Sequence, residues 1–425
     1  MSRLLIISHD FIGRRMAGVG IRYFEIARAL ANQGLAVTLA APKPLESPSA
    51  SIPALLKLES FQNLTEARMS EWIRQHEVVF AYPDTIWQCR EALDSWAVPV
   101  VVDGYDITLF EHLEMDADRP IEIRMRWHRD YQQMMSYVLQ RGDFFVVGTE
   151  RQRDFWLGML AAAGRVNALN YQHDPLLCRL VGLLPYGIPD SPPTHTQNVI
   201  RSVLPSVCAS DVVVLWGGGA WPWLDPVTLL EAAALIRKQR EDFKFIFPGV
   251  SHPHAPQADQ SAVRNSLRAH SRRLELDERC VFFLDWVPYD QWSCYLVESD
   301  IGVSLHREHL ESRFSLRTRV LSYIWAGLPM VLSKGDDLAE SAAQAGIAVL
   351  VDPGDAQATA SALLCLAERK QHRSQKTLEP LESMRASLRW SVVVRALCEF
   401  CSNPQLAADR RGLQSFTPSL SQAHT

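Results

Sequence analysis

The chain has 425 residues, a length typical of two domains, and its 47% hydrophobic and 21% charged residues are ordinary for a globular protein. Its 43 Lys and Arg are outnumbered by 48 Asp and Glu, and the net charge of -5 argues against a nucleic-acid binder with a broad basic surface. No apolar run approaches the roughly 18 residues that cross a bilayer. The Cys residues are scattered, which favours a reducing compartment over a disulfide framework, so we expect a cytoplasmic protein.

The N-terminal half begins with a pattern typical of a parallel sheet. An apolar run over residues 4–8 predicts a strand, and a loop with Gly13, Gly18 and Gly20 follows it. Residues 21–30 have apolar side chains at helical spacing, and residues 36–42 predict the next strand. This order is a βαβ unit, which implies a right-handed crossover. Further strands are expected at residues 78–82, 98–102, 144–148 and 180–184.

A second α/β series follows a segment rich in Pro, Ser and Thr. Strands are expected at residues 212–216, 243–248, 281–284, 301–305, 330–333 and 348–351, with helices between them. We therefore expect two doubly wound, Rossmann-like α/β domains facing across a cleft. The expected parts are residues 1–190, a linker over 191–210, residues 211–382, a helix over 383–403 that can return to the first domain, and a disordered tail over 404–425.

Two glycine loops are the first candidates for a binding site, because ligands of open α/β sheets bind beyond the carboxyl ends of the strands. Gly18 and Gly20 precede a helix, where a backbone can approach a ligand and free N–H groups can bind an anion. The alternative there is a tight turn. The second loop consists of Gly217, Gly218 and Gly219 after an apolar strand, which favours phosphate binding without matching a Walker or dinucleotide fingerprint.

Charged residues form a third candidate, between a predicted strand and an apolar helix. Guanidinium groups match phosphate geometry, and carboxylates can bind sugar hydroxyls. This segment supplies Glu311, Arg313, Ser315, Arg317, Thr318 and Arg319. The alternative is a solvated, salt-bridged face. In the first half, Asp106 and His112 follow a strand and are candidates for contact with an acceptor or a sugar, with helix capping as the alternative for the carboxylate.

Taken in order over about residues 4–400, these segments resemble glycosyltransferase family 4. The motifs that carry the resemblance are Trp286-Val287-Pro288, residues 298–304, residues 311–329 ending in Ala326-Gly327-Leu328-Pro329, the three-glycine loop and residues 16–30. A bacterial subgroup associated with surface polysaccharides is the closer match. It is similar in the Arg317-x-Arg319 pair, in residues 152–158 and in the turn Pro185-Tyr186-Gly187.

The resemblance implies the GT-B fold, with an acceptor domain followed by a donor domain that binds a nucleotide-sugar. It implies retaining transfer with no metal and no cofactor, to a glycan or lipid-linked acceptor, and no nucleic-acid partner. Arg317, Arg319 and both glycine loops would then hold the diphosphate, Glu311 would orient the donor sugar, and the base would lie near Trp286 and Val287. Arginines within residues 119–129 extend this expectation to a peripheral contact with the inner membrane face, with a solvated helix as the alternative.

Two positions depart from the family pattern. Ser322 stands where the family usually has its second acid, and residues 221–226, after the glycine loop, contain no Arg or Lys. Two alternatives therefore stay open. One is a degenerate, non-catalytic GT-B protein that acts as a binding or assembly partner. The other is a nucleotide-sugar epimerase, which would interconvert sugar nucleotides without an acceptor.

Overall fold

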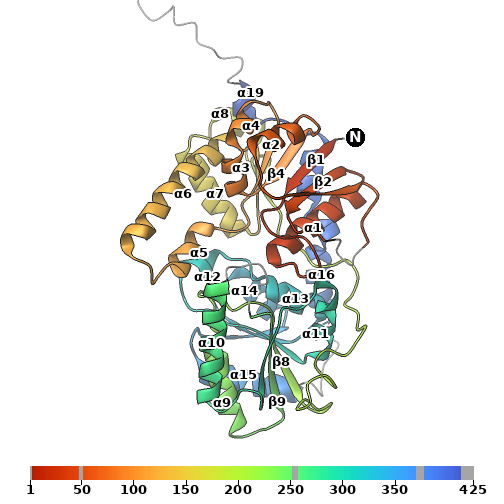
Figure 1. Cartoon of the computed structure of the whole chain (residues 1–425), viewed down its shortest axis with the longest axis vertical. Helices are drawn as coiled ribbons and strands as arrows, with labels where there is room; N and C mark the ends of the chain where they lie inside the picture. The colour runs from red at the N-terminus through yellow and green to blue at the C-terminus, as the bar shows by residue number, and fades with distance from the viewer. Residues whose placement is uncertain (1, 47–50, 251–256, 370–377, 413–425) are drawn as a thin grey trace, which may run out of the picture.

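The computed structural model describes residues 2–46, 51–250, 257–369 and 378–412. It contains two parallel β-sheets with their helices, arranged one above the other along the long axis of the molecule (Figure 1). The expected pair of α/β domains is thereby confirmed. None of the helices in the described ranges is long and apolar enough to span a bilayer.

The N-terminal sheet has seven parallel strands in the order β3-β2-β1-β4-β5-β6-β7. Alternate residues of β1 belong to different hydrophobic clusters, Leu4 and Ile6 to one and Leu5 and Ile7 to the other, so both faces of the sheet are buried. The strands are β1 (Arg3–Ile7), β2 (Ala36–Pro42), β3 (Leu56–Phe61), β4 (Val78–Ala81), β5 (Val100–Asp103), β6 (Phe144–Val147) and β7 (Val181–Leu183).

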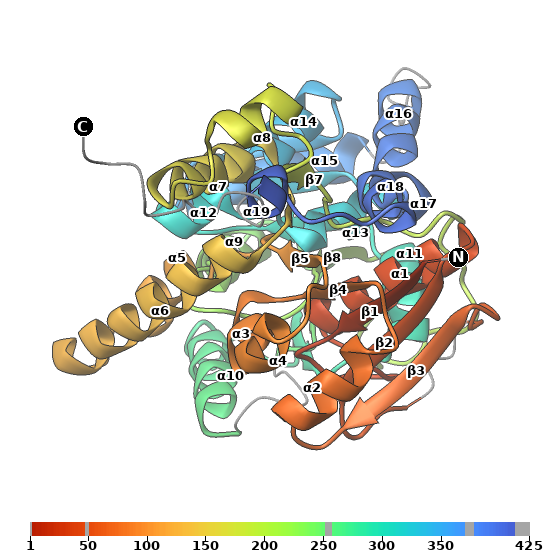
Figure 2. The ribbon, with the colours of Figure 1, turned by 90° about the horizontal axis from the view of Figure 1, so that it is seen from above.

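The helices of this domain connect successive strands. They are α1 (Gly18–Asn32), α2 (Glu66–Ile73), α3 (Pro83–Gln88), α4 (Arg90–Asp94), α5 (Thr108–Met115), α6 (Ile121–Arg141), α7 (Glu150–Ala162) and α8 (Ala168–His173). Seen from above, α6 extends away from the body of the molecule (Figure 2).

The second sheet has six parallel strands in the order β10-β9-β8-β11-β12-β13. Its strands are β8 (Val212–Trp216), β9 (Phe243–Pro248), β10 (Val281–Leu284), β11 (Ile301–Ser304), β12 (Met330–Ser333) and β13 (Ala348–Val351), close to the expected ranges. Its helices are α9 (Pro226–Arg237), α10 (Gln257–Arg273), α11 (Trp292–Glu298), α12 (Leu310–Phe314), α13 (Thr318–Ala326), α14 (Asp337–Gln344) and α15 (Ala356–Arg369).

The C-terminal helices cross from the second domain back to the first. α16 (Leu378–Leu388) contacts α13, where Arg385 Nε donates to the carbonyl of Ile324 at 2.9 Å. α17 (Trp390–Val393) and α18 (Arg395–Ser402) lie on the first domain, with α17 beside α1 (Figure 2). The single helix expected over residues 383–403 is divided, because Arg389 has extended backbone and forms a β-bridge with Ile188.

The expected tail from residue 404 is partly packed. α19 (Ala408–Gly412) carries the buried Asp409, whose Oδ2 accepts a hydrogen bond from Arg165 Nε at 2.6 Å. The N–H of Ala407 donates to Asp143 Oδ1 at 2.8 Å. Because these partners lie far away in the sequence, local composition could not indicate the packing of residues 404–412. The remainder of the tail, residues 413–425, lies outside the described residues.

The two domains are in contact at several places. The Phe314 ring of α12 packs between Phe110 of α5 and Phe155 of α7, with centroid distances of 5.2 and 5.7 Å. Elsewhere Tyr289 donates its hydroxyl to Glu25 Oε1 of α1 at 2.6 Å. These contacts hold the two domains together with the carboxyl ends of their strands facing each other. The loops at these ends form the walls of a cleft.

Candidate functional site

A cavity of about 500 Å³ lies between the two domains, where the carboxyl ends of their strands face each other. The first domain contributes the start of α1, the loop after β5 and part of α5. The second domain contributes the three-glycine loop, the loop after β10 and the segment from α12 into α13. Most of the residues singled out in the sequence line this cavity, namely Gly18, Asp106, Gly217, Gly218, Gly219, Trp286, Val287, Glu311, Ser315, Arg317, Thr318 and Arg319.

Three predicted residues do not line it. His112 pairs through Nδ1 with Asp116 at 2.9 Å and stacks on Trp127 at a centroid distance of 3.9 Å, so its ring is directed toward α6. Arg313 is exposed and lies over the ring of Phe314. Gly20 is buried within α1, where a Cβ would lie 2.3 Å from the carbonyl oxygen of Phe11, so this glycine permits close backbone packing.

The second domain supplies a basic wall. Arg317 Nη2 donates to Glu311 Oε2 at 3.2 Å, and Arg319 Nη2 donates to the carbonyl of Gly219 at 3.0 Å while its guanidinium lies over the Trp216 ring. Burial lowers the pKa of Arg319 to about 10. Arg317 Nε and Arg319 Nη1 are buried without a hydrogen-bond partner among the described residues. Both cations are therefore incompletely compensated, as expected beside an anion site.

The three-glycine loop offers fewer free amides than expected. The N–H of Gly217 donates to the hydroxyl of Tyr323 at 2.7 Å, and the N–H of Gly218 donates to the carbonyl of Trp216 at 3.0 Å. A Cβ on Gly217 would lie 2.9 Å from that tyrosine hydroxyl, so close packing also requires glycine there. Of the three amides, the one of Gly219 is the one with no bond to the protein among the described residues.

The start of α1 is open to the cavity. The helix begins at Gly18, and its N-cap residue Ala17 makes no side-chain capping bond. A Cβ on Gly18 would meet nothing within 4 Å. The first N–H groups of a helix attract anions, and Gly18 and Ala17 both line the cavity.

Aromatic side chains cover much of the second-domain wall. Trp286 donates its Nε1 hydrogen to the carbonyl of Met16 across the cleft at 3.3 Å. Trp292 donates to Ser322 Oγ at 3.2 Å, so the serine that replaces the expected acid positions an indole. Trp223, Trp292 and Tyr289 also line the cavity, although none of them was selected as a site residue from the sequence. Flat apolar rings of this kind can pack against a base or a sugar.

The first domain supplies an acidic wall. Burial raises the pKa of Asp106 to about 7 and raises the pKa of Glu111 well above its ordinary value. Repulsion from Asp103 and Glu311 adds to the shift of Asp106, and repulsion from Asp106 and Glu311 adds to the shift of Glu111. Glu111 was not among the selected site residues, although it is one of the carboxylates that follow this strand and it precedes His112 by one position in α5. The phase of the helix decides that Glu111 lines the cavity and His112 does not.

Asp103 lies at the end of β5 beneath this wall and has a structural role. Its carboxylate accepts bonds from Arg22 Nη2 at 2.8 Å and Nε at 3.1 Å, and both side chains are fully buried. Within the described ranges no group of three or more His, Cys, Asp or Glu side chains is placed to hold a metal ion.

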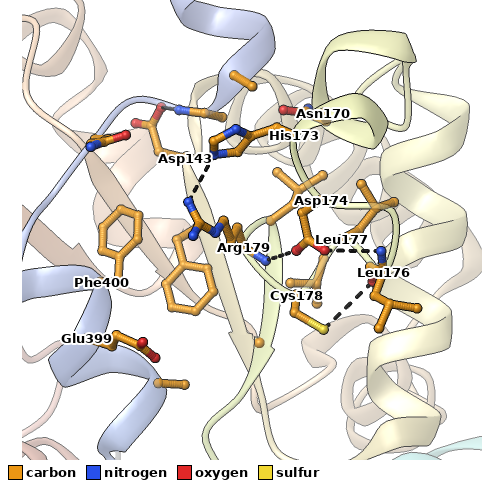
Figure 3. A pocket seen from close by; sticks show the side chains of 18 of the residues that line it. Asp143, Asn170, His173, Asp174, Leu176, Leu177, Cys178, Arg179, Glu399 and Phe400 are labelled. Carbon is orange, nitrogen blue, oxygen red and sulfur yellow. Dashed lines mark hydrogen bonds between the residues drawn. The ribbon is translucent and has the colours of Figure 1, made fainter.

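A second cavity, of about 790 Å³, lies away from the cleft between β7 and the C-terminal segment (Figure 3). Its wall includes Phe144 and Phe400, whose rings stack at 4.8 Å. Arg179 lies in this cavity with Nη1 3.1 Å from His173 Nε2, and its backbone N–H donates to Asp174 (Figure 3). None of the residues predicted for the site lines it.

Comparison with known proteins agrees with this geometry. Residues 211–369 match the family described as Glycosyl transferases group 1. No curated protein matches the sequence.

Solved structures of the same fold align over nearly the whole chain. They include sucrose-phosphate synthase from Thermosynechococcus elongatus, with 14% identity, a TM-score of 0.62, and coverage of 98% of this chain and 100% of that one. Anabaena HepE in complex with UDP-glucose has 14% identity and a TM-score of 0.63, with coverage of 98% and 100%. WaaG, a glycosyltransferase involved in lipopolysaccharide biosynthesis, has 14% identity and a TM-score of 0.58, with coverage of 94% and 100%. The chain therefore has the GT-B fold of these structures, and residues of its second domain match the Glycosyl transferases group 1 family.

Proposed function

We propose that the chain is a retaining, metal-independent glycosyltransferase of family 4. It moves a sugar from a nucleoside diphosphate to a glycan or lipid-linked acceptor in polysaccharide or glycoconjugate biosynthesis, and it needs no cofactor. The observation that carries this proposal is the pair of incompletely compensated guanidinium groups, Arg317 and Arg319, opposite the uncapped start of α1. The UDP-glucose bound to HepE and the pathway of WaaG support the donor class and the biosynthetic role.

In this reaction the bond between the anomeric carbon and the diphosphate oxygen breaks, and a new bond forms to the acceptor oxygen on the same face. The acceptor proton passes to the departing phosphate, so no enzyme nucleophile is required. Arg317, Arg319 and the N–H groups at Gly18 lie on both sides of the departing negative charge and stabilise it. Glu311, held by Arg317, accepts hydrogen bonds from the donor sugar, and the domain contacts exclude water.

A non-catalytic GT-B protein is the second candidate, and Ser322 favours it. The hydroxyl of Ser322 accepts a bond from Trp292, at the position where the family usually has its second acid. A protein of this kind would bind a nucleotide in the cleft without transferring sugar.

A peripheral membrane contact is part of the proposal and is supported by α6. Its first turns expose Ile121, Ile123 and Met125, with exposed arginines at positions 126 and 129. Because α6 extends from the acceptor side of the cleft, this surface would place a lipid-linked acceptor near Asp106 (Figure 2). Co-sedimentation with anionic vesicles should weaken in an Ile123→Asp variant, and equal sedimentation of variant and wild type would exclude the contact.

The test of the main proposal is nucleotide binding followed by turnover. Melting temperatures are measured with UDP, GDP and ADP, and at least one nucleotide should raise the value. The increase should disappear in Arg319→Met and persist in Arg307→Met, an exposed arginine of the same segment that does not line the cavity. The matching nucleotide-sugars are then assayed for slow hydrolysis. Absence of binding to all three nucleotides overturns the proposal, and binding without hydrolysis or transfer selects the non-catalytic candidate.

A further inference from the structure

The two walls of the cleft differ in charge. Arg317 and Arg319, the Lys or Arg side chains that line the cavity, both belong to the second domain. The first domain lines the same cavity with the carboxyl groups of Asp10, Asp106 and Glu111, and none of its described Lys, Arg or His residues contributes to the lining.

The basic groups near the acidic wall either pair with other carboxylates or are neutral. Arg22 forms its ion pair with Asp103, and neither side chain is exposed. His112 pairs with Asp116. His9 lies against the rings of Tyr23 and Tyr82, and desolvation by the surrounding protein lowers its pKa, so that its ring is mostly neutral near pH 7. Asp106 and Glu111 themselves form no ion pair with a Lys or Arg in the described part of the chain.

The part of this wall that Asp106 and Glu111 form matches hydroxyl groups and does not match a phosphate. A carboxylate accepts a hydrogen bond from a hydroxyl, a protonated carboxyl donates one, and a sugar hydroxyl can do either. Because the pKa of Asp106 is raised to about 7, both of its forms are present near neutral pH, and burial favours the protonated form of Glu111. A phosphate dianion needs cations or several donors, and it is repelled once Asp106 ionises. Met115 lies one turn after Glu111 on α5 and adds an apolar surface for the ring of a sugar.

We infer that the first-domain wall selects a neutral, polyhydroxylated acceptor, a sugar ring that carries no phosphate or carboxylate, and that Asp106 and Glu111 bind its hydroxyls. This inference rests on the proposed function of the same cleft. If the acceptor is lipid-linked, its phosphate lies outside the cavity. Glu111 thereby becomes a specificity residue that borders the site next to Asp106.

The test compares matched neutral and phosphorylated sugars on the full chain. Protein saturated with the nucleotide that raises its melting temperature is titrated by calorimetry at pH 8, where Asp106 is ionised. The probes are methyl glycosides and short neutral oligosaccharides of glucose, galactose and mannose, each paired with its 6-phosphate. The expected result is that the tightest probe is neutral and binds at least tenfold more strongly than its phosphorylated partner.

Variants test whether Asp106 and Glu111 cause the preference for neutral over phosphorylated sugars. In the double variant Asp106→Asn, Glu111→Gln the ratio of neutral to phosphate affinity should fall at least tenfold. In Glu114→Gln, a carboxyl of α5 outside the cavity lining, the ratio should stay at the wild-type value. The inference is overturned if a phosphorylated sugar binds as tightly as its neutral partner, if no neutral probe binds, or if the double variant keeps the wild-type ratio. Nucleotide binding is measured in a separate experiment, so a failure of this inference can be distinguished from a failure of the proposed function.

Discussion

Glu311 accepts a hydrogen bond from Arg317 Nη2 at 3.2 Å, and both side chains are buried at the edge of the cleft. His309, the N-cap of α12, lies beside this pair with its Nδ1 3.7 Å from Glu311 Oε2. Its Nδ1 accepts from the N–H of Ser312 at 3.1 Å, and its Nε2 lies 2.9 Å from the carbonyl of Trp223. The ring is thereby held as the tautomer with its hydrogen on Nε2. The ion pair therefore fixes a carboxylate and a guanidinium together where donor sugar and diphosphate would meet.

Two substitutions of Glu311 should distinguish its effect on stability from its effect on catalysis. Glu311→Ala leaves Arg317 buried without a counter-charge and should lower the free energy of unfolding by about 3–5 kcal/mol. Glu311→Gln keeps a hydrogen-bond acceptor and should lower stability less, while kcat falls by about 100-fold or more because the donor sugar is misplaced. Urea unfolding and initial rates measure the two effects. A Gln variant with wild-type kcat would contradict the proposed orienting role.

We expect the buried charge of Arg319 to lower the stability of the protein when no nucleotide is bound. Its lowered pKa and its unpaired Nη1 show that burial of this cation is only partly compensated. Arg319→Met should therefore melt at or above the wild-type temperature without nucleotide, while nucleoside diphosphate affinity falls by about 10- to 100-fold. A lower melting temperature combined with unchanged affinity would show that Arg319 is a structural residue.

Asp106 should make stability depend on pH in an unusual direction. Its pKa is raised by burial from 3.8 to about 7 in the folded protein, so between these values the folded state holds a proton that the unfolded state has lost. The contribution of this group to stability is then largest at low pH and falls as pH rises through this window. Asp106→Asn removes the titration, so the variant should gain stability over wild type at pH 8 and show a smaller gain at pH 5. Urea unfolding at both pH values measures this, and an equal difference at both pH values would refute the assigned shift.

Gly18 and Gly20 should respond differently to the same added methyl group. Gly20→Ala places a Cβ 2.3 Å from the carbonyl oxygen of Phe11 and should lower the free energy of unfolding by about 1–3 kcal/mol or more. Gly18→Ala meets no atom within 4 Å and should unfold like wild type. Because Gly18 borders the cavity, that variant should bind the nucleotide more weakly. A stable Gly20→Ala variant would show that the backbone between Phe11 and α1 can shift.

Much of the fold could be predicted because its signals are local. Apolar runs followed by glycine and helical spacing identify β1, α1 and β2, and the same reasoning locates the strands of the second sheet. β3 was missed because it is an edge strand whose residues are mostly half-exposed or exposed, so it has no continuous apolar run. The break between α16 and α17 depends on the pairing of Arg389 with Ile188, about 200 positions earlier in the chain.

The sequence by itself determined which residue types stand after each strand, and most of the residues selected on that basis line the cavity, including Arg317, Arg319 and Glu311. Only the tertiary structure decided which of their atoms remain available to a ligand. The amide of Gly217 is occupied by Tyr323, which lies 106 positions away in the chain, and the phase of α5 exposes Glu111 to the cleft in place of His112. The physical reason is that residue type sets which hydrogen bonds a group can form. Whether its donors and acceptors stay free for a ligand depends on the partners that distant segments bring to it.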